Sequence, residues 1–243
     1  MKKMFLYLIV VIIILPLSAV YHKIGEYGTP SYALSVTVSN NIAYVAAWDA
    51  GLQIIDISNP QNPSLLGSYD TPDYANYVVM SDNIVYVAGG ESGLLIVDVT
   101  NPENPFLLSS YYTTGSAFSV DFYNSIAYVA NGWAGLQIID VSNPENPSLL
   151  GSYDTPDWAY SVFVSNNIAY VADGWAGLQI IDVSNPQNPV LLVSYDTPRY
   201  AESVTVSNNI AYVADGWAGL QIIDVTNPQN PFILGSYHTP YYA

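Results

Sequence analysis

One stretch of this chain, residues 177–189, recurs with small changes at a constant spacing. A fixed period of 42 residues without insertions indicates one structural unit that is stacked repeatedly. Each unit is expected to bury its apolar face on the next unit. The five copies begin at Gly51, Gly93, Gly135, Gly177 and Gly219.

Each unit contains four short apolar segments that are separated by turn residues. In the fourth unit the segments span residues 161–164, 168–172, 178–183 and 190–195. Several segments are apolar on both faces, which indicates strands that are sandwiched between neighbouring sheets. An Asp-Gly turn after the second segment favours antiparallel hairpins over the parallel coils of a solenoid. The sequence therefore predicts an all-β fold, a β-propeller of four-stranded antiparallel blades.

The repeats predict five blades and one additional strand. Residues 21–30 align, 42 positions on, with residues 63–72, which form the outer, fourth segment of the first unit. We expect an extra N-terminal outer strand and favour a closed five-bladed ring, in which this strand lies on the edge of the last blade. An open arc that another chain completes is the alternative. The five units begin near Ser31, Ala75, Ala117, Ala159 and Ala201.

The charge balance narrows the possible partners. The 243 residues include 20 acidic and 4 basic side chains, which give a net charge of −16. Such a surface repels nucleic acid and anionic lipid headgroups, and it helps to keep a repetitive β protein soluble. The chain has no cysteine, so disulfides are excluded.

Residues 1–20 differ in character from the repeats. Lys2 and Lys3 precede an apolar run over residues 4–17, and small residues follow it. This order is typical of a cleaved signal peptide, and the run is shorter than the roughly 18 residues of a spanning helix. An uncleaved signal anchor is the alternative. Both predict that residues 21–243 form an exported domain, secreted or at the cell surface, which meets the membrane only through an uncleaved N-terminal segment.

The third segment of each unit carries a recognisable motif. Residues 94–99 read Leu-Leu-Ile-Val-Asp-Val and residues 178–183 read Leu-Gln-Ile-Ile-Asp-Val, and both precede Ser/Thr-Asn-Pro. This motif resembles the LVIVD repeat, over residues 21–243. The resemblance implies a β-propeller of a kind found in surface and secreted proteins of bacteria and archaea, and it implies no particular activity. Glutamine at the second position departs from the family motif at Gln53, Gln137, Gln179 and Gln221.

An aspartate ends the third segment of every unit. A recurring acid suggests a ligand, but a carboxylate two residues before a Ser/Thr-Asn-Pro turn can also accept backbone N–H bonds and fix that turn. We interpret these residues as structural turn acids. They are Asp56, Asp98, Asp140, Asp182 and Asp224.

Aromatic and acidic residues recur in two sets of loops that a propeller brings to one rim. The loops between second and third strands carry Trp133, Trp175, Trp217, Asp173 and Asp215. The loops that link consecutive blades carry Tyr32, Tyr74, Trp158, Tyr200, Asp73 and Asp157.

Two interpretations of these rim residues stay open. Rings beside carboxylates suit stacking on sugars, capture of cations or anchoring of a protein. Alternatively, the tryptophans pack between blades as covers, as repeated aromatic residues do in propellers. The acids offer little for catalysis, because similar blades give similar carboxylates and not one acid and one base of different pKa.

These patterns favour an exported, non-catalytic binding module that presents an aromatic and acidic face to a protein or glycan at the cell surface. A polysaccharide-active hydrolase or lyase that uses Asp73, Asp157 and Asp173 is one alternative, and a structural cell-surface scaffold is another. We expect no catalytic residue, cofactor or nucleic-acid partner, and weak calcium binding by dispersed carboxylates stays open. His22 and His238 are not at metal-ligand spacing.

Overall fold

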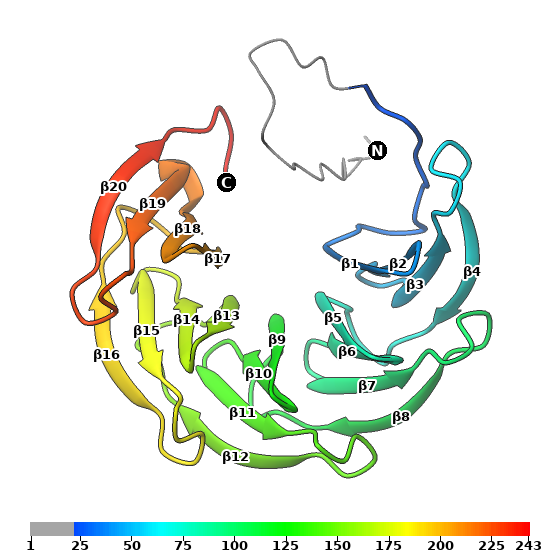
Figure 1. Cartoon of the computed structure of the whole chain (residues 1–243), viewed down its shortest axis with the longest axis horizontal. Helices are drawn as coiled ribbons and strands as arrows, with labels where there is room; N and C mark the ends of the chain where they lie inside the picture. The colour runs from blue at the N-terminus through cyan, green and yellow to red at the C-terminus, as the bar shows by residue number, and fades with distance from the viewer. Residues whose placement is uncertain (1–21) are drawn as a thin grey trace.

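A computed structural model describes residues 22–243, and the predicted signal segment lies outside the described residues. In this part of the chain, five antiparallel sheets of four strands follow one another around an arc (Figure 1). Each sheet orders its strands as they occur in the chain. Within the described range, no helix is long and apolar enough to cross a membrane. The all-β fold with four-stranded antiparallel blades is therefore confirmed.

The strands have nearly the same lengths in every blade. Blade 1 contains β1 (Ser35–Ser39), β2 (Ile42–Ala46), β3 (Leu52–Asp56) and β4 (Ser64–Tyr69). Blade 2 contains β5 (Tyr77–Ser81), β6 (Ile84–Ala88), β7 (Leu94–Asp98) and β8 (Phe106–Tyr111). Blade 3 contains β9 (Ser119–Tyr123), β10 (Ile126–Ala130), β11 (Leu136–Asp140) and β12 (Ser148–Tyr153). Blade 4 contains β13 (Ser161–Ser165), β14 (Ile168–Ala172), β15 (Leu178–Asp182) and β16 (Val190–Tyr195). Blade 5 contains β17 (Ser203–Ser207), β18 (Ile210–Ala214), the 3-10 helix η1 (Gly216–Ala218), β19 (Leu220–Asp224) and β20 (Phe232–Tyr237).

The first hairpin of each blade turns on residues that tolerate left-handed backbone. In blade 1, Asn40 and Asn41 have φ of 50° and 62°. Two successive positive φ values match the twist of a two-residue hairpin, and asparagine adopts this conformation more readily than other non-glycine residues. The register of β1 on β2 follows directly, with Ser39 paired to Ile42.

The apolar cores lie between blades. Leu136 and Ile138 of blade 3 pack in one cluster with Val171 and Ile181 of blade 4, and all four are fully buried. The two middle strands are thus covered on both faces, which explains why their sequences do not alternate between apolar and polar residues. Each blade depends on its neighbours for burial.

The ring is open, unlike the closed ring favoured from the sequence. Blades 1 and 5 lie at the two ends of the arc, with a gap between them (Figure 1). Large side chains separate neighbouring blades, as where Tyr86 of blade 2 stacks on Phe122 of blade 3 at 5.0 Å. The five blades therefore do not complete a circle.

The N-terminal segment occupies an outer position without forming the predicted strand. Residues 22–30 contain no strand. A Cβ on Gly25 would meet the backbone oxygen of Pro60, just as one on Gly67 of β4 would meet that of Pro102. The segment therefore lies against blade 1 as β4 lies against blade 2. Within residues 22–243, no strand pairs with this segment.

Blade 5 leaves one face without a neighbouring blade. Tyr212, Leu220 and Ile222 are half-buried there, whereas Ile138, which occupies the position of Ile222 in blade 3, is fully buried. The same residue type thus has two environments in one chain.

This pair provides a test of the packing between blades. Ile138→Ala should lower the free energy of unfolding by about 2–5 kcal/mol, because it leaves a cavity in a closed core. Ile222→Ala, the matched control, should lower it by well under half as much, because its site is already partly hydrated. Urea unfolding followed by circular dichroism measures both. Equal losses would contradict the assignment of the cores to the spaces between blades.

The turn acids bond to the chain two residues ahead. The Ser184 N–H donates to Asp182 Oδ1 at 2.8 Å. Corresponding bonds of 2.7–2.9 Å occur at the other four aspartates. Hydrogen bonds from Ser184 lower the pKa of Asp182, and those from Ser142 lower the pKa of Asp140.

These turns should make the free energy of unfolding depend on pH. A carboxyl group whose pKa is lower in the folded state contributes stability above its unfolded pKa, and this contribution is lost as the pH falls through the folded pKa. Asp182→Ala should therefore lower the urea midpoint at pH 7 and have less effect at pH 2. Asp182→Asn keeps the acceptor without the titration, and should unfold near the wild-type midpoint at pH 7. An Asp182→Ala effect that is equal at both pH values would refute this account.

Candidate functional site

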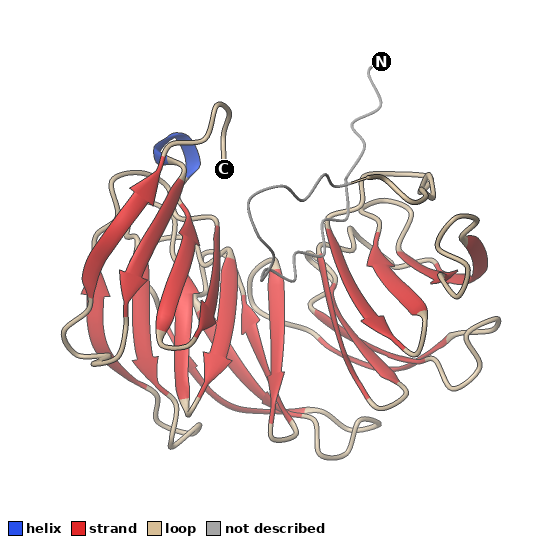
Figure 2. Cartoon of the chain, turned by 45° about the horizontal axis from the view of Figure 1, so that its top comes forward, coloured by secondary structure: helices blue, strands red, loops and turns tan. Residues whose placement is uncertain are grey.

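The rim that carries the predicted site residues is built from paired loops. The loop between the second and third strands of one blade bonds to the linker that enters the next blade. In blade 4, the Gly174 N–H donates to the Ala201 carbonyl at 3.2 Å, and the Ala201 N–H donates back at 2.9 Å. The same bridge occurs between Trp48 and Ala75, and between Gly90 and Ala117. The rim is therefore a chain of tied loops, gathered at one end of the blades (Figure 2).

Two of the predicted rim acids lie beneath the surface. Asp173 and Asp215 have no exposed area. The Thr155 hydroxyl donates to Asp173 Oδ1 at 2.6 Å, and the Asp157 N–H donates to Oδ2 at 3.2 Å. Burial raises the pKa of both aspartates, while these hydrogen bonds and their counterparts at Asp215 act in the opposite direction. Both carboxylates fix the linker and do not face a ligand.

The other two predicted acids hold the loops from the linker side. The Glu91 N–H donates to Asp73 Oδ2, and the Trp175 N–H donates to Asp157 Oδ2, both at 2.7 Å. Both aspartates are half-buried. They position the tips of the loops that follow, including the loop that carries Trp175.

The glutamines that depart from the family motif also support these loops. Gln179 is fully buried, and its amide nitrogen donates to the Ala176 carbonyl at 2.7 Å. Gln53 makes the same bond to Ala50 at 2.6 Å. Leu95 of blade 2 lacks this side-chain bond, although the backbone of its loop makes the same bridge between Gly90 and Ala117.

The loop tryptophans are exposed and do not act as covers between blades. Trp133, Trp175 and Trp217 are 58%, 64% and 64% exposed. Each extends from a short loop that is fixed by the bonds described above. Of the linker aromatics, Trp158 is 41% exposed, and Tyr200 is half-buried.

The rim of blades 1 and 2 is built differently. Trp48 stands where the other blades have glycine, and its φ is 46°. It stacks on Tyr74 at 4.6 Å and meets Tyr32 edge-on at 5.6 Å. These three aromatic residues pack on one another, which compensates for the unfavourable backbone conformation at Trp48.

A continuous row of rings runs over blades 3 to 5. Tyr160 lies 5.1 Å from Phe118, 6.2 Å from Trp158 and 5.4 Å from Tyr200, measured between ring centres. Tyr200 donates a hydrogen bond to the Tyr160 hydroxyl at 2.7 Å and meets Trp175 edge-on. We call this row the aromatic band. It comprises Phe118, Trp158, Tyr160, Trp175 and Tyr200.

The band ends in an apolar cleft between blades 4 and 5. The cleft has a volume of about 290 Å³. Two edge-on pairs line it, Trp217 with Tyr242 and Trp175 with Tyr200, each with ring centres 5.4 Å apart. A hydrogen bond with Glu202 raises the pKa of Tyr242 to about 12, so this phenol stays protonated near neutral pH. We call it the tryptophan cleft, lined by Trp175, Arg199, Tyr200, Trp217 and Tyr242.

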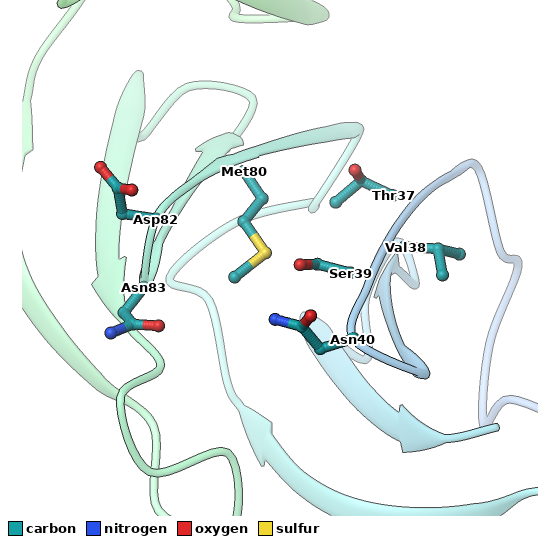
Figure 3. Close-up of a pocket in the computed structure, with 7 residues that line it drawn as sticks. All are labelled: Thr37, Val38, Ser39, Asn40, Met80, Asp82 and Asn83. Atoms are coloured by element: carbon teal, nitrogen blue, oxygen red, sulfur yellow. The ribbon is translucent and has the colours of Figure 1, made fainter. Parts of the chain in front are cut away.

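A larger, polar hollow lies elsewhere, at the first hairpins of blades 1 and 2. Its volume is about 500 Å³, and Met80 lies among hydroxyl and amide groups there (Figure 3). Asp82 is the one titratable residue in its lining, so the hollow contains no acid–base pair. The lining residues are Thr37, Val38, Ser39, Asn40, Met80, Asp82 and Asn83.

The titratable side chains do not form a metal centre in the described range. No group of three or more histidine, cysteine, aspartate or glutamate side chains within residues 22–243 could hold a metal ion. A half-buried carboxylate that the sequence analysis overlooked, Asp121 of blade 3, accepts the Val164 N–H of blade 4 at 2.7 Å. Burial raises its pKa.

Sequence reasoning also overlooked Phe118, Tyr160 and Tyr242. Phe118 and Tyr160 occupy one repeat position, 42 residues apart, where the other copies have Leu34, Asn76 and Glu202. Because that position is aromatic in so few copies, the repeat pattern alone did not indicate a site. Alignment of the linkers was the available signal.

Comparison with known families identifies the repeat. The LVIVD repeat matches five successive segments, residues 30–71, 72–113, 114–155, 158–197 and 198–239. These segments cover most of the sequence, so the chain belongs to the LVIVD repeat family.

Two solved structures illustrate the likeness of fold. The crystal structure of the computationally designed Ika8 protein superposes with a TM-score of 0.70 at 15% sequence identity, over 88% of this chain and 64% of that one. The computationally designed Ika4 protein gives a TM-score of 0.55 at 15% identity, over 66% of this chain and 96% of that one. This chain thus spans somewhat less than two thirds of the Ika8 length. A search of curated proteins finds no match to this sequence.

The buried rim acids give a testable prediction. Asp173→Ala should destabilise the protein by about 1–3 kcal/mol, because it leaves the Thr155 hydroxyl and the Asp157 N–H without their acceptor. Asp173→Asn should cost less, because Asn131 fills the same position in blade 3, where its amide nitrogen can donate to the Thr113 hydroxyl at 2.8 Å. Chemical denaturation at pH 7 measures both.

The pH dependence provides a second readout for Asp173. Because its pKa is raised in the folded state, the folded protein holds this proton more tightly, so the contribution of Asp173 to stability falls as the pH rises through the range between the unfolded and folded pKa values. Asp173→Asn should remove that dependence. An unchanged pH profile in Asp173→Asn would rule out titration of this buried group.

Proposed function

We propose that this protein is an exported, non-catalytic binding module whose aromatic band and tryptophan cleft hold glycans. The cleft carries the proposal. Two tryptophans, each 64% exposed, line a hollow of about 290 Å³, which is large enough for one sugar ring. The proposal places the protein outside the cell, at its surface or secreted.

The loops that carry these rings are fixed by hydrogen bonds, which favours binding of a ligand. Large apolar side chains exposed to water cost solubility, and contiguous ones mark interaction sites. Here the loop tips are held by Asp157 below Trp175, and by the bond from Ala243 N–H to Gly216 at 3.1 Å beside Trp217. Rings that are fixed before binding lose little conformational entropy on contact, and flat aromatic faces suit the C–H faces of pyranose rings.

The state of the rim acids supports binding over hydrolysis. Asp173 is fully buried, and Asp73 and Asp157 each accept a backbone N–H. A glycosidase needs two carboxyl groups that flank a reachable sugar bond. The hydrolase alternative would require these groups to leave their structural bonds, so the aromatic surface is the better-supported candidate for function.

The test is loss of glycan binding on removal of single rings. Soluble polysaccharides are screened by affinity electrophoresis, and affinities for the best ligand are measured by tryptophan fluorescence. Trp175→Ala or Trp217→Ala should weaken binding roughly 30-fold, the effect of a residue worth about 2 kcal/mol at an interface.

Trp133→Ala is the matched control for these variants. Trp133 has the same repeat position and nearly the same exposure as Trp175, but it lies outside the cleft. The Trp133→Ala variant should bind the glycan nearly as well as wild type. The proposal would be refuted if all three variants bound glycan as tightly as wild type, or if the wild type bound no glycan. Capture of a protein ligand that depends on Trp175 and Trp217 would reassign the same surface to protein recognition.

A further inference from the structure

We infer that the tryptophan cleft selects an acidic sugar, a hexuronic acid residue whose carboxylate pairs with Arg199. This inference rests on the proposed function and specifies its ligand class. Arg199 places a positive charge in an otherwise apolar hollow, and this charge determines which sugars the cleft prefers.

Arg199 interrupts a pattern of acids. Asp73 and Asp157 occupy its position in the linkers that enter blades 2 and 4, and each fixes the loop 18 residues ahead. An arginine cannot accept that N–H bond, because its guanidinium has donors only. Blade 5 therefore gives up one structural bond that two other blades keep, and it gains a cation at the rim.

The guanidinium is available to a ligand. Arg199 is exposed, and within residues 22–243 the one ion pair is between Lys23 and Glu26. The backbone N–H of Arg199 donates to Asp215 at 3.1 Å, which fixes the start of its side chain. Arg199 lines the cleft together with aromatic side chains alone, so no acid of the lining competes for it.

The cleft chemistry defines the class of ligand. Trp175 and Trp217 offer apolar faces that suit the C–H faces of a sugar ring. The guanidinium offers a planar pair of donors that match a carboxylate. A hexuronic acid carries both features on one ring, whereas a neutral hexose would leave the charge of Arg199 unpaired.

The net charge of −16 does not oppose this pairing at close range. Fields from distant surface acids are screened beyond about 8 Å at physiological ionic strength. The acids nearest the cleft are already engaged, because Asp215 is buried and accepts the Arg199 N–H, and Glu202 shares a hydrogen bond with Tyr242. Arg199 is therefore the one charged side chain of the cleft lining that can pair with an anion.

The experiment compares acids with their own methyl esters. Tetramers of galacturonate, glucuronate and mannuronate, and their fully methyl-esterified forms, are titrated into the purified protein by calorimetry. At least one acid should bind about tenfold more tightly than its ester. Arg199→Gln should bring acid and ester to equal affinity, and Arg199→Lys should keep part of the preference.

The outcomes distinguish a failure of the acidic-sugar inference from a failure of the proposed glycan binding. Equal affinity for each acid and its ester in the wild type would overturn the inference but leave glycan binding intact. An acid preference that survives in Arg199→Gln would also overturn it. Trp217→Ala should weaken acid and ester alike, which distinguishes stacking from charge. Absence of binding to these tetramers and to every neutral glycan would refute the proposed function itself.

Discussion

Burial of both faces of each blade by its neighbours is the interaction on which this structure depends. The middle strands are apolar on both sides, and residues such as Ile138 and Ile181 reach full burial only because another blade covers them. A single blade could not hide these faces. The repetition of the sequence therefore has a direct physical purpose, since each unit provides the cover that the adjacent unit lacks.

The rim inherits its rigidity from this stack but not its symmetry. Bridges such as Gly174 to Ala201 recur between blades, and buried carboxylates or amides fix the linkers beneath. The side chains above that common frame differ from blade to blade. Trp48 is packed among tyrosines in blade 1, whereas Trp175 and Trp217 each touch one tyrosine edge-on and are 64% exposed. One face of a repetitive scaffold can thus carry one particular site.

The sequence predicted the blades because strand pattern, turn residues and spacing all repeat. It did not predict the open ring, because the repeat spacing defines the strands of each blade but not the angle at which one blade packs on the next. The rim loops were located correctly, but the roles of Asp173 and Asp215 were not evident. A carboxylate in a loop is expected to be exposed, and only the structure shows that the Thr155 hydroxyl and the linker enclose Asp173.

The last residues of the chain have a double role. Ala243 bonds to Gly216 and so closes the loop that carries Trp217, while Tyr242 forms a wall of the tryptophan cleft. Any molecule that rests against Tyr242 must also hold this segment in place. Occupancy of the cleft and the docking of residues 242–243 on the loop of Trp217 are therefore thermodynamically linked, and a bound ligand would hold this segment against blade 5.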